Sequence, residues 1–240
     1  MRRLVVIPTY NEVTNAPILI SRLLKWVPDC EILVIDDGSP DGTAESVHSL
    51  TKEESRLSLV TRDSKLGLGS AYRFGFEWGL ARGFDEFIEM DADLSHRVRD
   101  LKLLIDAKSA NPAAELVIGS RWITGGSITD WSWHRELLSR IANRYVRLAL
   151  GLGVNDSTSG FRIYSASLLR RINLDQIKSE GYSFQIEMTR AAARVGAKIV
   201  EVPITFRERS SGVSKMSGRI VFEAMGRVTL WGIKRILGSK

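Results

Sequence analysis

The sequence predicts an α/β fold, a Rossmann-like, mostly parallel sheet that helices cover on both faces. The first observation is that Val/Ile/Leu-rich runs alternate with helical patterns through the first 120 residues. The apolar runs predict strands at 4–8, 31–37, 56–60, 86–93 and 115–120. The segments between them, at 14–27, 43–54, 70–82 and 98–109, have the apolar spacing of amphipathic helices. Near-continuous apolar strands that alternate with helices are typical of parallel sheets buried on both faces.

The second observation is that polar residues gather directly after three of these strands. Residues 9–12 follow the first strand, 36–41 follow the second, and 91–96 follow the fourth. Because ligands of open α/β sheets bind beyond the carboxyl ends of the strands, these segments predict one shared pocket.

The second half of the chain is less regular, but it continues the same domain. Residues 121–134 are rich in Gly, Ser and Trp, which is typical of a loop. The remaining patterns predict helices at 135–150, 183–195 and 218–237 and strands at 160–165, 198–202 and 203–208. Since no repeat or linker composition interrupts the chain, we expect a single domain over residues 1–240. Its first 120 or so residues form one half and the remainder forms the other.

Composition limits the function classes without choosing among them. The net charge of +6 suggests anionic partners, which could be nucleic acid, a membrane surface or phosphorylated substrates. The single Cys30 excludes an intramolecular disulfide and leaves too few thiols for a structural zinc site. No run approaches the ~18 uncharged residues that a membrane span requires. The N-terminal apolar stretch stops at Pro8 with no cleavage site after it, so we expect no signal peptide.

The segment Asp91-Ala92-Asp93 is the sharpest chemical signal. It closes the predicted strand 86–93, and residues i and i+2 of a strand point to the same side, so we expect both carboxylates to face one spot. Two hard oxygen anions at a strand end suit Mg²⁺ or Mn²⁺, which binds diphosphate oxygens alongside one or two carboxylates. A solvated turn or a helix cap would use the same residue types.

Two further segments have the composition of a nucleoside site. The stretch 36–43 is a turn by composition, in which a carboxylate could accept hydrogen bonds from a base or a ribose. In the stretch 8–12, Tyr10 could stack on a base and Glu12 could accept from a ribose. Ordinary turn and cap chemistry explains either stretch equally well.

In their order and spacing, these motifs resemble the inverting family 2 glycosyltransferases of the GT-A fold. The motifs concerned are VVIPTYNE, ILVIDDGSPDGT, KLGLGSAYRFGF and EMDADLSH. The later motifs IGSRW, WSWHRELLSR, DSTSGFRIY, GYSFQIEM and RERSSGVSKMS are narrower, and with them the chain resembles the dolichyl- or polyprenyl-phosphate mannose synthases. The resemblance covers about residues 3–237.

The resemblance implies a role for each matching position. The nucleoside would be held by Pro8, Tyr10, Glu12, Ile35 and Asp37. The diphosphate would face Asp91, Ala92 and Asp93, with Asp91 and Asp93 near the metal. The lipid phosphate would be bound by Arg121, Arg135 and Ser139. Arg209 and Lys215 would close over the donor diphosphate. Ser95 stands where archaeal relatives have a glutamine near the metal.

The residue types agree with the implied phosphate site. Arg135 and Ser139 are four residues apart at the start of a helix, so they share one face. A helix N-terminus offers free N–H groups to an anion, and Arg121 offers a bidentate fork. The alternative for each is a solvated surface side chain. Similarly, the loop 210–217 resembles a lid but could be an ordinary loop.

The resemblance implies an activity, which is the inverting transfer of mannose from GDP-mannose to a polyprenyl (dolichyl) phosphate to give a β-linked mannosyl phosphate. A metal-dependent family 2 enzyme that uses UDP-glucose or another nucleotide sugar is the alternative within the class. A nucleic-acid-binding module and an inactive scaffold subunit are alternatives outside it. The first has only the charge in its favour, and we expect no nucleic-acid partner. Intact candidate site residues argue against the second.

A polyprenyl acceptor also implies a membrane. In the helix 135–150, Arg140, Arg144 and Arg147 form a basic stripe beside apolar residues, and the terminal helix is amphipathic. Such helices suit a bilayer surface, although the same faces could pack on the sheet. We therefore expect peripheral association with the cytoplasmic face of the membrane, with or without a small membrane-protein partner.

Overall fold

A seven-stranded sheet forms the centre of the protein, with the strand order β3-β2-β1-β4-β7-β5-β8. The structure, a computed structural model, describes residues 1–208 and 218–237, with side chains for 1–208 and 224–237. The strands are β1 (Arg3–Thr9), β2 (Cys30–Asp36), β3 (Leu57–Thr61), β4 (Glu86–Glu89), β5 (Leu116–Ser120), β7 (Arg162–Ser165) and β8 (Ile199–Pro203). All are parallel except β7, which runs antiparallel to both β4 and β5. The predicted α/β class and its mostly parallel sheet are confirmed.

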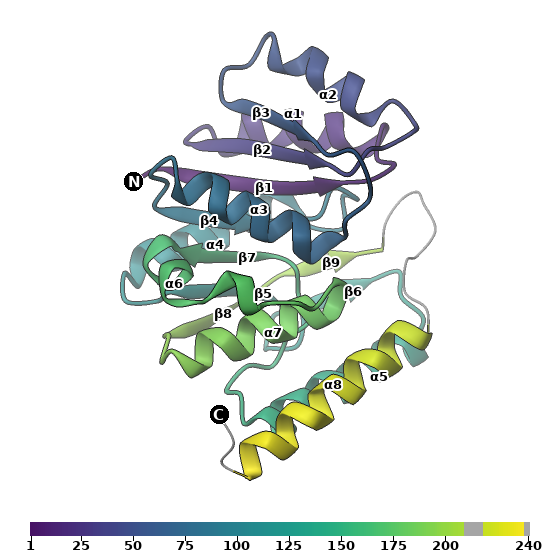
Figure 1. Cartoon of the computed structure of the whole chain (residues 1–240), viewed down its shortest axis with the longest axis vertical. Helices are drawn as coiled ribbons and strands as arrows, with labels where there is room; N and C mark the ends of the chain where they lie inside the picture. The colour runs from purple at the N-terminus through teal and green to yellow at the C-terminus, as the bar shows by residue number, and fades with distance from the viewer. Residues whose placement is uncertain (209–217, 238–240) are drawn as a thin grey trace.

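Helices cover both faces of this sheet (Figure 1). The elements α1 (Asn15–Trp26), α2 (Thr43–Thr51) and α4 (Val98–Ala110) pack on one face, and α3 (Leu68–Leu80), α6 (Ala166–Arg171) and α7 (Gly181–Arg194) pack on the other. A short 3₁₀ turn, η1 (Leu174–Gln176), precedes α7. The last two helices are α5 (Trp133–Leu150) and α8 (Gly218–Ile236).

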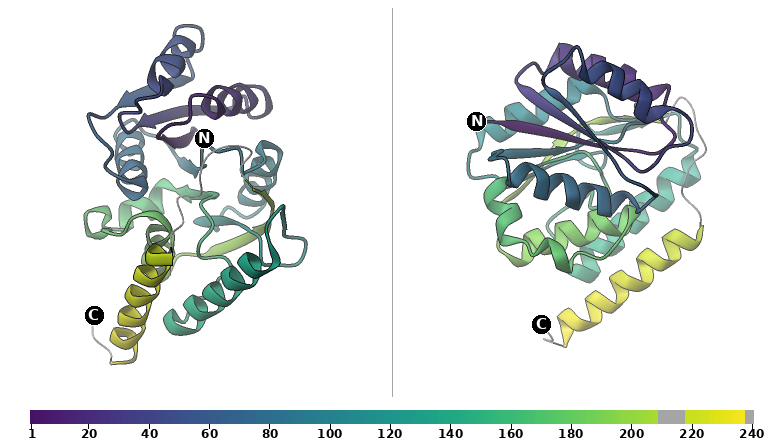
Figure 2. Two further views of the ribbon diagram at one scale, coloured as in Figure 1. Left: turned by 90° about the vertical axis from the view of Figure 1, so that its right-hand side faces the viewer. Right: turned by 45° about the horizontal axis from the view of Figure 1, so that its top comes forward.

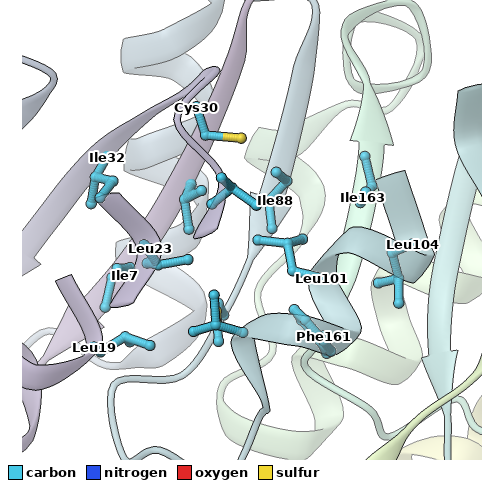
Figure 3. Close-up of a cluster of buried hydrophobic side chains, with 14 of the residues drawn as sticks. Ile7, Leu19, Leu23, Cys30, Ile32, Ile88, Leu101, Leu104, Phe161 and Ile163 are labelled. Carbon is cyan, nitrogen blue, oxygen red and sulfur yellow. The ribbon is translucent and has the colours of Figure 1, made fainter. Parts of the chain in front are cut away.

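Strand alternation divides the core into two layers. In β1, Val5 and Ile7 face the α1 and α4 side, whereas Leu4 and Val6 face α3. Figure 3 shows the first layer, where leucines of α1 and α4 meet Ile7 and Ile88 of the sheet. Because every second residue of the central strands is apolar on both faces, neither face can be left to solvent, and the helices must cover both.

Three features differ from the sequence prediction. The strand β4 ends at Glu89, so residues 90–93 form a turn and not the end of a strand. The predicted loop 121–134 contains β6 (Ser127–Thr129), which pairs in parallel with β9 (Thr205–Arg207). The elements α6 and η1 were not predicted. Short segments of this kind have too few residues to show a period, and β6 exists only because a distant strand pairs with it.

The helices α5 and α8 lie side by side at one end of the molecule, beyond the sheet (Figures 1 and 2). Val146 and Leu150 of α5 form a small buried cluster with Val228 of α8 and Ile186 of α7. The Tyr145 hydroxyl is 2.7 Å from the Thr229 hydroxyl, which adds a polar link between the two helices. Over the described ranges, no helix is long and apolar enough to span a bilayer.

Candidate functional site

A cavity opens at the carboxyl ends of β1, β2 and β4, at the edge where the sequence predicts a pocket. Three chain segments that follow these strands meet there, and the start of α7 closes the far side. The lining residues are Pro8, Thr9, Tyr10, Glu12, Asp37, Lys65, Gly67, Leu68, Asp91, Ala92, Asp93, Thr158, Gly160, Gly181, Tyr182 and Gln185.

Asp91 and Asp93 both line this cavity, but a turn brings them together and not strand alternation. Because β4 ends at Glu89, the expectation that the two side chains share one face of a strand is wrong. Leu94 adopts a left-handed φ of 62°, and the Ser95 backbone N–H donates to Asp93 Oδ1 at 3.0 Å. A non-glycine residue in this conformation is uncommon and persists only where its surroundings hold it. The tight turn after β4 therefore presents both carboxylates to the cavity.

The two carboxylates differ in their surroundings. Asp91 is 34% exposed, and the Tyr72 hydroxyl donates to its Oδ1 at 3.2 Å. Burial, and then the negative charge of Asp91, raise the pKa of Tyr72 well above its usual value, so Tyr72 is a neutral hydrogen-bond donor. Asp93 is buried, with only 5% of its surface exposed.

The donor set of this turn fits a hard divalent cation. Two further groups lie close to the two carboxylates in the sequence: the buried Ser95 hydroxyl and the two ring nitrogens of His96. These three atoms have no hydrogen-bond partner in the part of the chain that the structure describes. His96 Nε2 lies 3.7 Å from Asp91 Oδ2, and its ring stacks on Phe161 at 4.8 Å. Within that same part, no cluster of three or more His, Cys, Asp or Glu residues is spaced for a metal. Two carboxylates without further protein ligands of this kind suit Mg²⁺ or Mn²⁺, because such a cation takes its remaining ligands from water and diphosphate oxygens.

After β2, two strands along the sheet from β4, Asp37 is held in place by the loop after β3. The Arg62 Nε donates to Asp37 Oδ1 at 2.6 Å, and the backbone N–H groups of Leu66 and Gly67 donate to Oδ2, each at 3.1 Å. The carboxylate is thus fixed before any ligand arrives.

The other predicted nucleoside residues lie around Asp37, with one exception. Pro8, Tyr10 and Glu12 line the cavity, and the Lys65 ammonium lies 4.0 Å from the centre of the Tyr10 ring. The exception is Ile35, whose side chain is completely buried on the α3 face of β2 and does not line the cavity. Any contact of Ile35 with a nucleoside would have to come from its backbone.

The guanidinium of Arg121 is engaged by an internal carboxylate, and its expected contact with the lipid phosphate stays a prediction. Its Nε and Nη2 donate to the two carboxylate oxygens of Asp156, both at 2.7 Å, and both side chains are buried. Burial alone would raise the pKa of Asp156, but the Arg121 guanidinium holds it below its usual value. The partner of this bidentate contact is an internal carboxylate, which sequence spacing could not identify.

The Arg121–Asp156 ion pair belongs to a hydrogen-bond network that connects the cavity wall with α5. Arg121 Nη2 also donates to the Thr158 hydroxyl at 2.9 Å, and Asn143 of α5 donates to the same oxygen at 3.0 Å. Since Thr158 lines the cavity, Arg121 positions that wall although it does not reach the cavity itself.

Arg135 and Ser139 lie on the first turns of α5, as predicted, but outside the cavity lining. Arg135 forms an ion pair with Glu208, and its guanidinium carbon lies 4.1 Å from the centre of the Trp131 ring. Ser139 is partly exposed, and its backbone carbonyl accepts a hydrogen bond from Asn143. The remaining candidates, Arg209 and Lys215, lie outside the described residues.

A buried charged cluster beneath the cavity was not anticipated from the sequence. Glu89, the last residue of β4, is completely buried, and its Oε2 lies 4.0 Å from Nε of the equally buried Arg162. Burial raises the pKa of Glu89 to about 8, against the opposing effect of Arg162. A charged residue inside an apolar strand was the available signal, since such residues are almost never fully buried unless paired.

Several cavity residues also escaped the sequence analysis, namely Lys65, Thr158, Gly160, Tyr182 and Gln185. All five lie within motifs that the family resemblance included, KLGLGSAYRFGF, DSTSGFRIY and GYSFQIEM. The motifs indicated which segments of the chain belong to the site, but only the fold shows which side chains reach the cavity.

Comparison with known proteins agrees with this architecture. The model of glycosyl transferase family 2 matches residues 4–172. The polyprenol monophosphomannose synthase of Mycolicibacterium smegmatis is 48% identical over 234 residues, which are 97% of this chain and 88% of that protein. The undecaprenyl-phosphate mannosyltransferase of Micrococcus luteus is 48% identical over 233 residues, 97% of this chain and 95% of that protein.

A solved structure supports the fold alone, because the identity is low. The glucosyl-3-phosphoglycerate synthase of Mycobacterium tuberculosis, in complex with phosphoglyceric acid, matches with a TM-score of 0.72 at 20% identity, over 96% of this chain and 79% of that one. The predicted GT-A fold is therefore confirmed. With a family model that matches well over half of its length and relatives at 48% identity over nearly all of it, the chain belongs to glycosyl transferase family 2.

Proposed function

We propose that the protein transfers mannose from GDP-mannose to a polyprenyl phosphate, with inversion at the anomeric carbon. The observation on which this rests is that Asp91 and Asp93 both line a cavity at the carboxyl edge of the sheet. In addition, two relatives at 48% identity over nearly the whole chain have names that specify polyprenyl-type phosphates and mannose.

The nucleotide-sugar donor would lie along the cavity, with its nucleoside and its diphosphate at successive positions. The nucleoside would lie beside Tyr10 and Asp37, which line the cavity after β1 and β2. The diphosphate would lie over the turn 91–93, where Asp91 and Asp93 would hold Mg²⁺ or Mn²⁺. When bound, the cation supplies positive charge at the diphosphate oxygens, and a complex of the structural neighbour above contains Mn²⁺ with UDP-glucose.

The attacking group in this proposal needs no catalytic base. A phosphate monoester has a second pKa of about 6, so a polyprenyl phosphate is largely a dianion at neutral pH. The protein's task is then to hold two anions close together in line for displacement, which is catalysis by positioning and electrostatic stabilisation. In-line attack on an α-linked donor gives a β-linked product.

On the acceptor side, Arg135 and Ser139 are the proposed phosphate contacts. Arg135 is paired with Glu208, at partial exposure, so an incoming phosphate could replace a carboxylate without uncovering a buried charge. Arg121 contributes differently, through Asp156 and Thr158, by fixing the wall that the acceptor would approach. The predicted roles of Arg209 and Lys215 at the diphosphate stay as predictions.

The acceptor also leads us to propose that the pair α5 and α8 rests on the cytoplasmic face of the membrane. The two helices expose large apolar side chains at one end of the molecule: Trp133, Leu137, Leu138, Ile141 and Leu148 of α5, and Leu230, Ile233, Ile236 and Leu237 of α8. Exposed basic residues accompany them, among them Arg144, Lys234 and Arg235. Apolar side chains with flanking cations suit a bilayer of anionic lipids, with or without a membrane-protein partner.

The test is incubation of the protein with GDP-mannose labelled in the sugar, Mg²⁺ or Mn²⁺, and a short polyprenyl phosphate. We expect the label to move into a product that is extracted by organic solvent and released by mild acid. Parallel reactions with UDP-glucose test the alternative donor, and competition by GDP or UDP in a thermal-shift assay tests the base. Label that moves only from UDP-glucose, or in no reaction, contradicts the proposal.

A further inference from the structure

Gln185 is a buried residue at the cavity wall whose side-chain amide makes no hydrogen bond of normal geometry with the described residues. The residue lies on α7, is 2% exposed and lines the cavity. In the described part of the chain, neither Oε1 nor Nε2 has a hydrogen bond of normal geometry. The amide also lies near the buried Glu89, and hydrogen bonding from Gln185 works against the rise in the pKa of Glu89, although no Gln185–Glu89 hydrogen bond falls within normal limits of distance and angle. Buried amides are nearly always paired, so one left open at a cavity wall indicates a missing ligand.

The position of the amide is well defined. The Gln185 backbone carbonyl accepts from Arg162 Nη1 at 3.1 Å and from the Thr189 hydroxyl at 2.8 Å. Arg162 is fully buried and also donates to the carbonyls of Ser157 and Ser159. This network anchors the start of α7 to the loop before β7, so the amide does not depend on a mobile element for its place.

The amide and the Asp91 carboxylate both lie next to Gly160. A Cβ atom at position 160 would lie 3.4 Å from Gln185 Nε2 and 3.5 Å from Asp91 Oδ2. The glycine thus leaves open the space between the amide and the carboxylate. A group bound next to the Asp91 turn would lie within reach of the amide.

The order of residues along the cavity indicates which group this is. Along this edge the strand order is β2, β1, β4 and β7, so the segments with Asp37, Tyr10 and Asp91 follow one another, and the loop before β7, with Gly160 and its neighbour Gln185, comes last. A nucleotide sugar is a linear sequence of nucleoside, diphosphate and sugar, so the sugar falls at the Gln185 end. A side-chain amide offers both a donor and an acceptor, which matches sugar hydroxyls better than an anion.

We propose that Gln185 binds the transferred sugar, with Nε2 donating to one sugar oxygen and Oε1 accepting from a sugar hydroxyl. The assignment rests on the proposed function, because it takes the ligand to be a nucleotide sugar. It makes Gln185 a specificity residue for the sugar and not for the nucleotide.

The experiment compares two ligands on Gln185→Met, which keeps the side-chain size and removes both polar atoms. Affinities for the nucleotide sugar and for its nucleoside diphosphate are measured by calorimetry with Mn²⁺. Loss of two neutral hydrogen bonds is expected to weaken nucleotide-sugar binding about tenfold. Binding of the nucleoside diphosphate is expected to stay unchanged, because it lacks the sugar.

The matched control is Thr189→Val, one turn further along α7. Thr189 is buried, belongs to the Arg162 network and does not line the cavity. This variant is expected to lower the melting temperature without changing the ratio of the two affinities. If Gln185→Met weakens both ligands equally, the role of Gln185 is structural and the proposal is overturned. It is also overturned if neither affinity changes, including the case in which only the KM for polyprenyl phosphate rises.

Failure of the proposed function gives a different result. The ligand pair is chosen as the nucleotide sugar that the wild-type protein transfers together with its own nucleoside diphosphate. If that donor is UDP-glucose, the GDP-mannose proposal fails while the Gln185 comparison proceeds with UDP-glucose and UDP.

Discussion

At the residue scale, the function depends on the two carboxylates of the turn after β4. We expect Asp91→Asn and Asp93→Asn each to lower transfer at least ~100-fold, because each removes charge from the site that neutralises the diphosphate. The measurement is turnover with labelled donor at saturating Mn²⁺. The control is Asp106→Asn, an exposed carboxylate on α4 that pairs only with Lys102 among the contacts described, and it should retain activity. Full wild-type activity after complete removal of metal by EDTA would refute the metal site.

The two arginines that the sequence grouped together are expected to behave oppositely. Arg121→Ala leaves Asp156 buried and unpaired, so it should lower the free energy of unfolding by about 3–5 kcal/mol. Arg135→Ala removes a partly exposed pair, so its stability cost should be at most about 1 kcal/mol. Its kinetic effect should be a larger rise in KM for polyprenyl phosphate than for the nucleotide sugar. Denaturant unfolding and steady-state kinetics measure the two effects, and an unchanged lipid KM would count against Arg135 as a phosphate contact.

At the element scale, α3 approaches the sheet closely because two glycines face it. A Cβ at Gly79 would lie 2.4 Å from Phe87 Cε1 and 2.7 Å from Leu4 Cδ2, and one at Gly75 would lie 2.5 Å from Val6. The helix therefore packs backbone against side chain over β1 and β4. Because α3 also provides Tyr72, this close approach sets the position of the hydroxyl that donates to Asp91.

We expect Gly79→Ala to destabilise the protein by about 1–3 kcal/mol, since the added methyl group has no room between Phe87 and Leu4. The matched control is Gly226→Ala on α8, where an added Cβ meets nothing within 4 Å. That substitution should be neutral or stabilise by up to about 1 kcal/mol, the ordinary helix preference of alanine. Chemical denaturation of both variants gives the comparison, and equal effects would show that the close packing of α3 is not limiting.

At the scale of the whole molecule, the α5 and α8 pair provides a surface separate from the cavity. Leu138 and Ile141 of α5 are 63% and 57% exposed. We expect the double substitution Leu138→Glu with Ile141→Glu to lower partitioning onto vesicles of anionic lipid at least about tenfold, because it removes apolar area and adds negative charge.

The control for this surface is Leu103→Glu on α4, an exposed apolar residue on another side of the fold. It should leave vesicle binding unchanged. Wild-type binding should also weaken as salt screens the basic side chains. Equal binding by the double variant and the wild-type protein in a sedimentation assay would show that another surface, or a membrane protein, recruits the enzyme.

The fold and the segments of the site were predictable because they depend on local patterns. Apolar runs that alternate with helical periods determine a parallel sheet, and polar residues after the runs determine which edge holds the cavity. That reasoning located Asp37, Asp91 and Asp93 correctly at the cavity. It placed the last two on a strand, because a continuous apolar run does not show that β4 stops at Glu89.

The sequence by itself determined the sheet, its two helical layers and the edge at which chemistry takes place, since each depends on residues that are neighbours in the chain. Only the tertiary structure decided which polar side chains pair with another side chain and which stay available to a ligand. Arg121 is paired with Asp156 across 35 positions, and Gln185 is left open beside Asp91. The physical reason is that a polar group's role depends on its nearest partner in space, and partners brought together by packing have no fixed spacing along the chain.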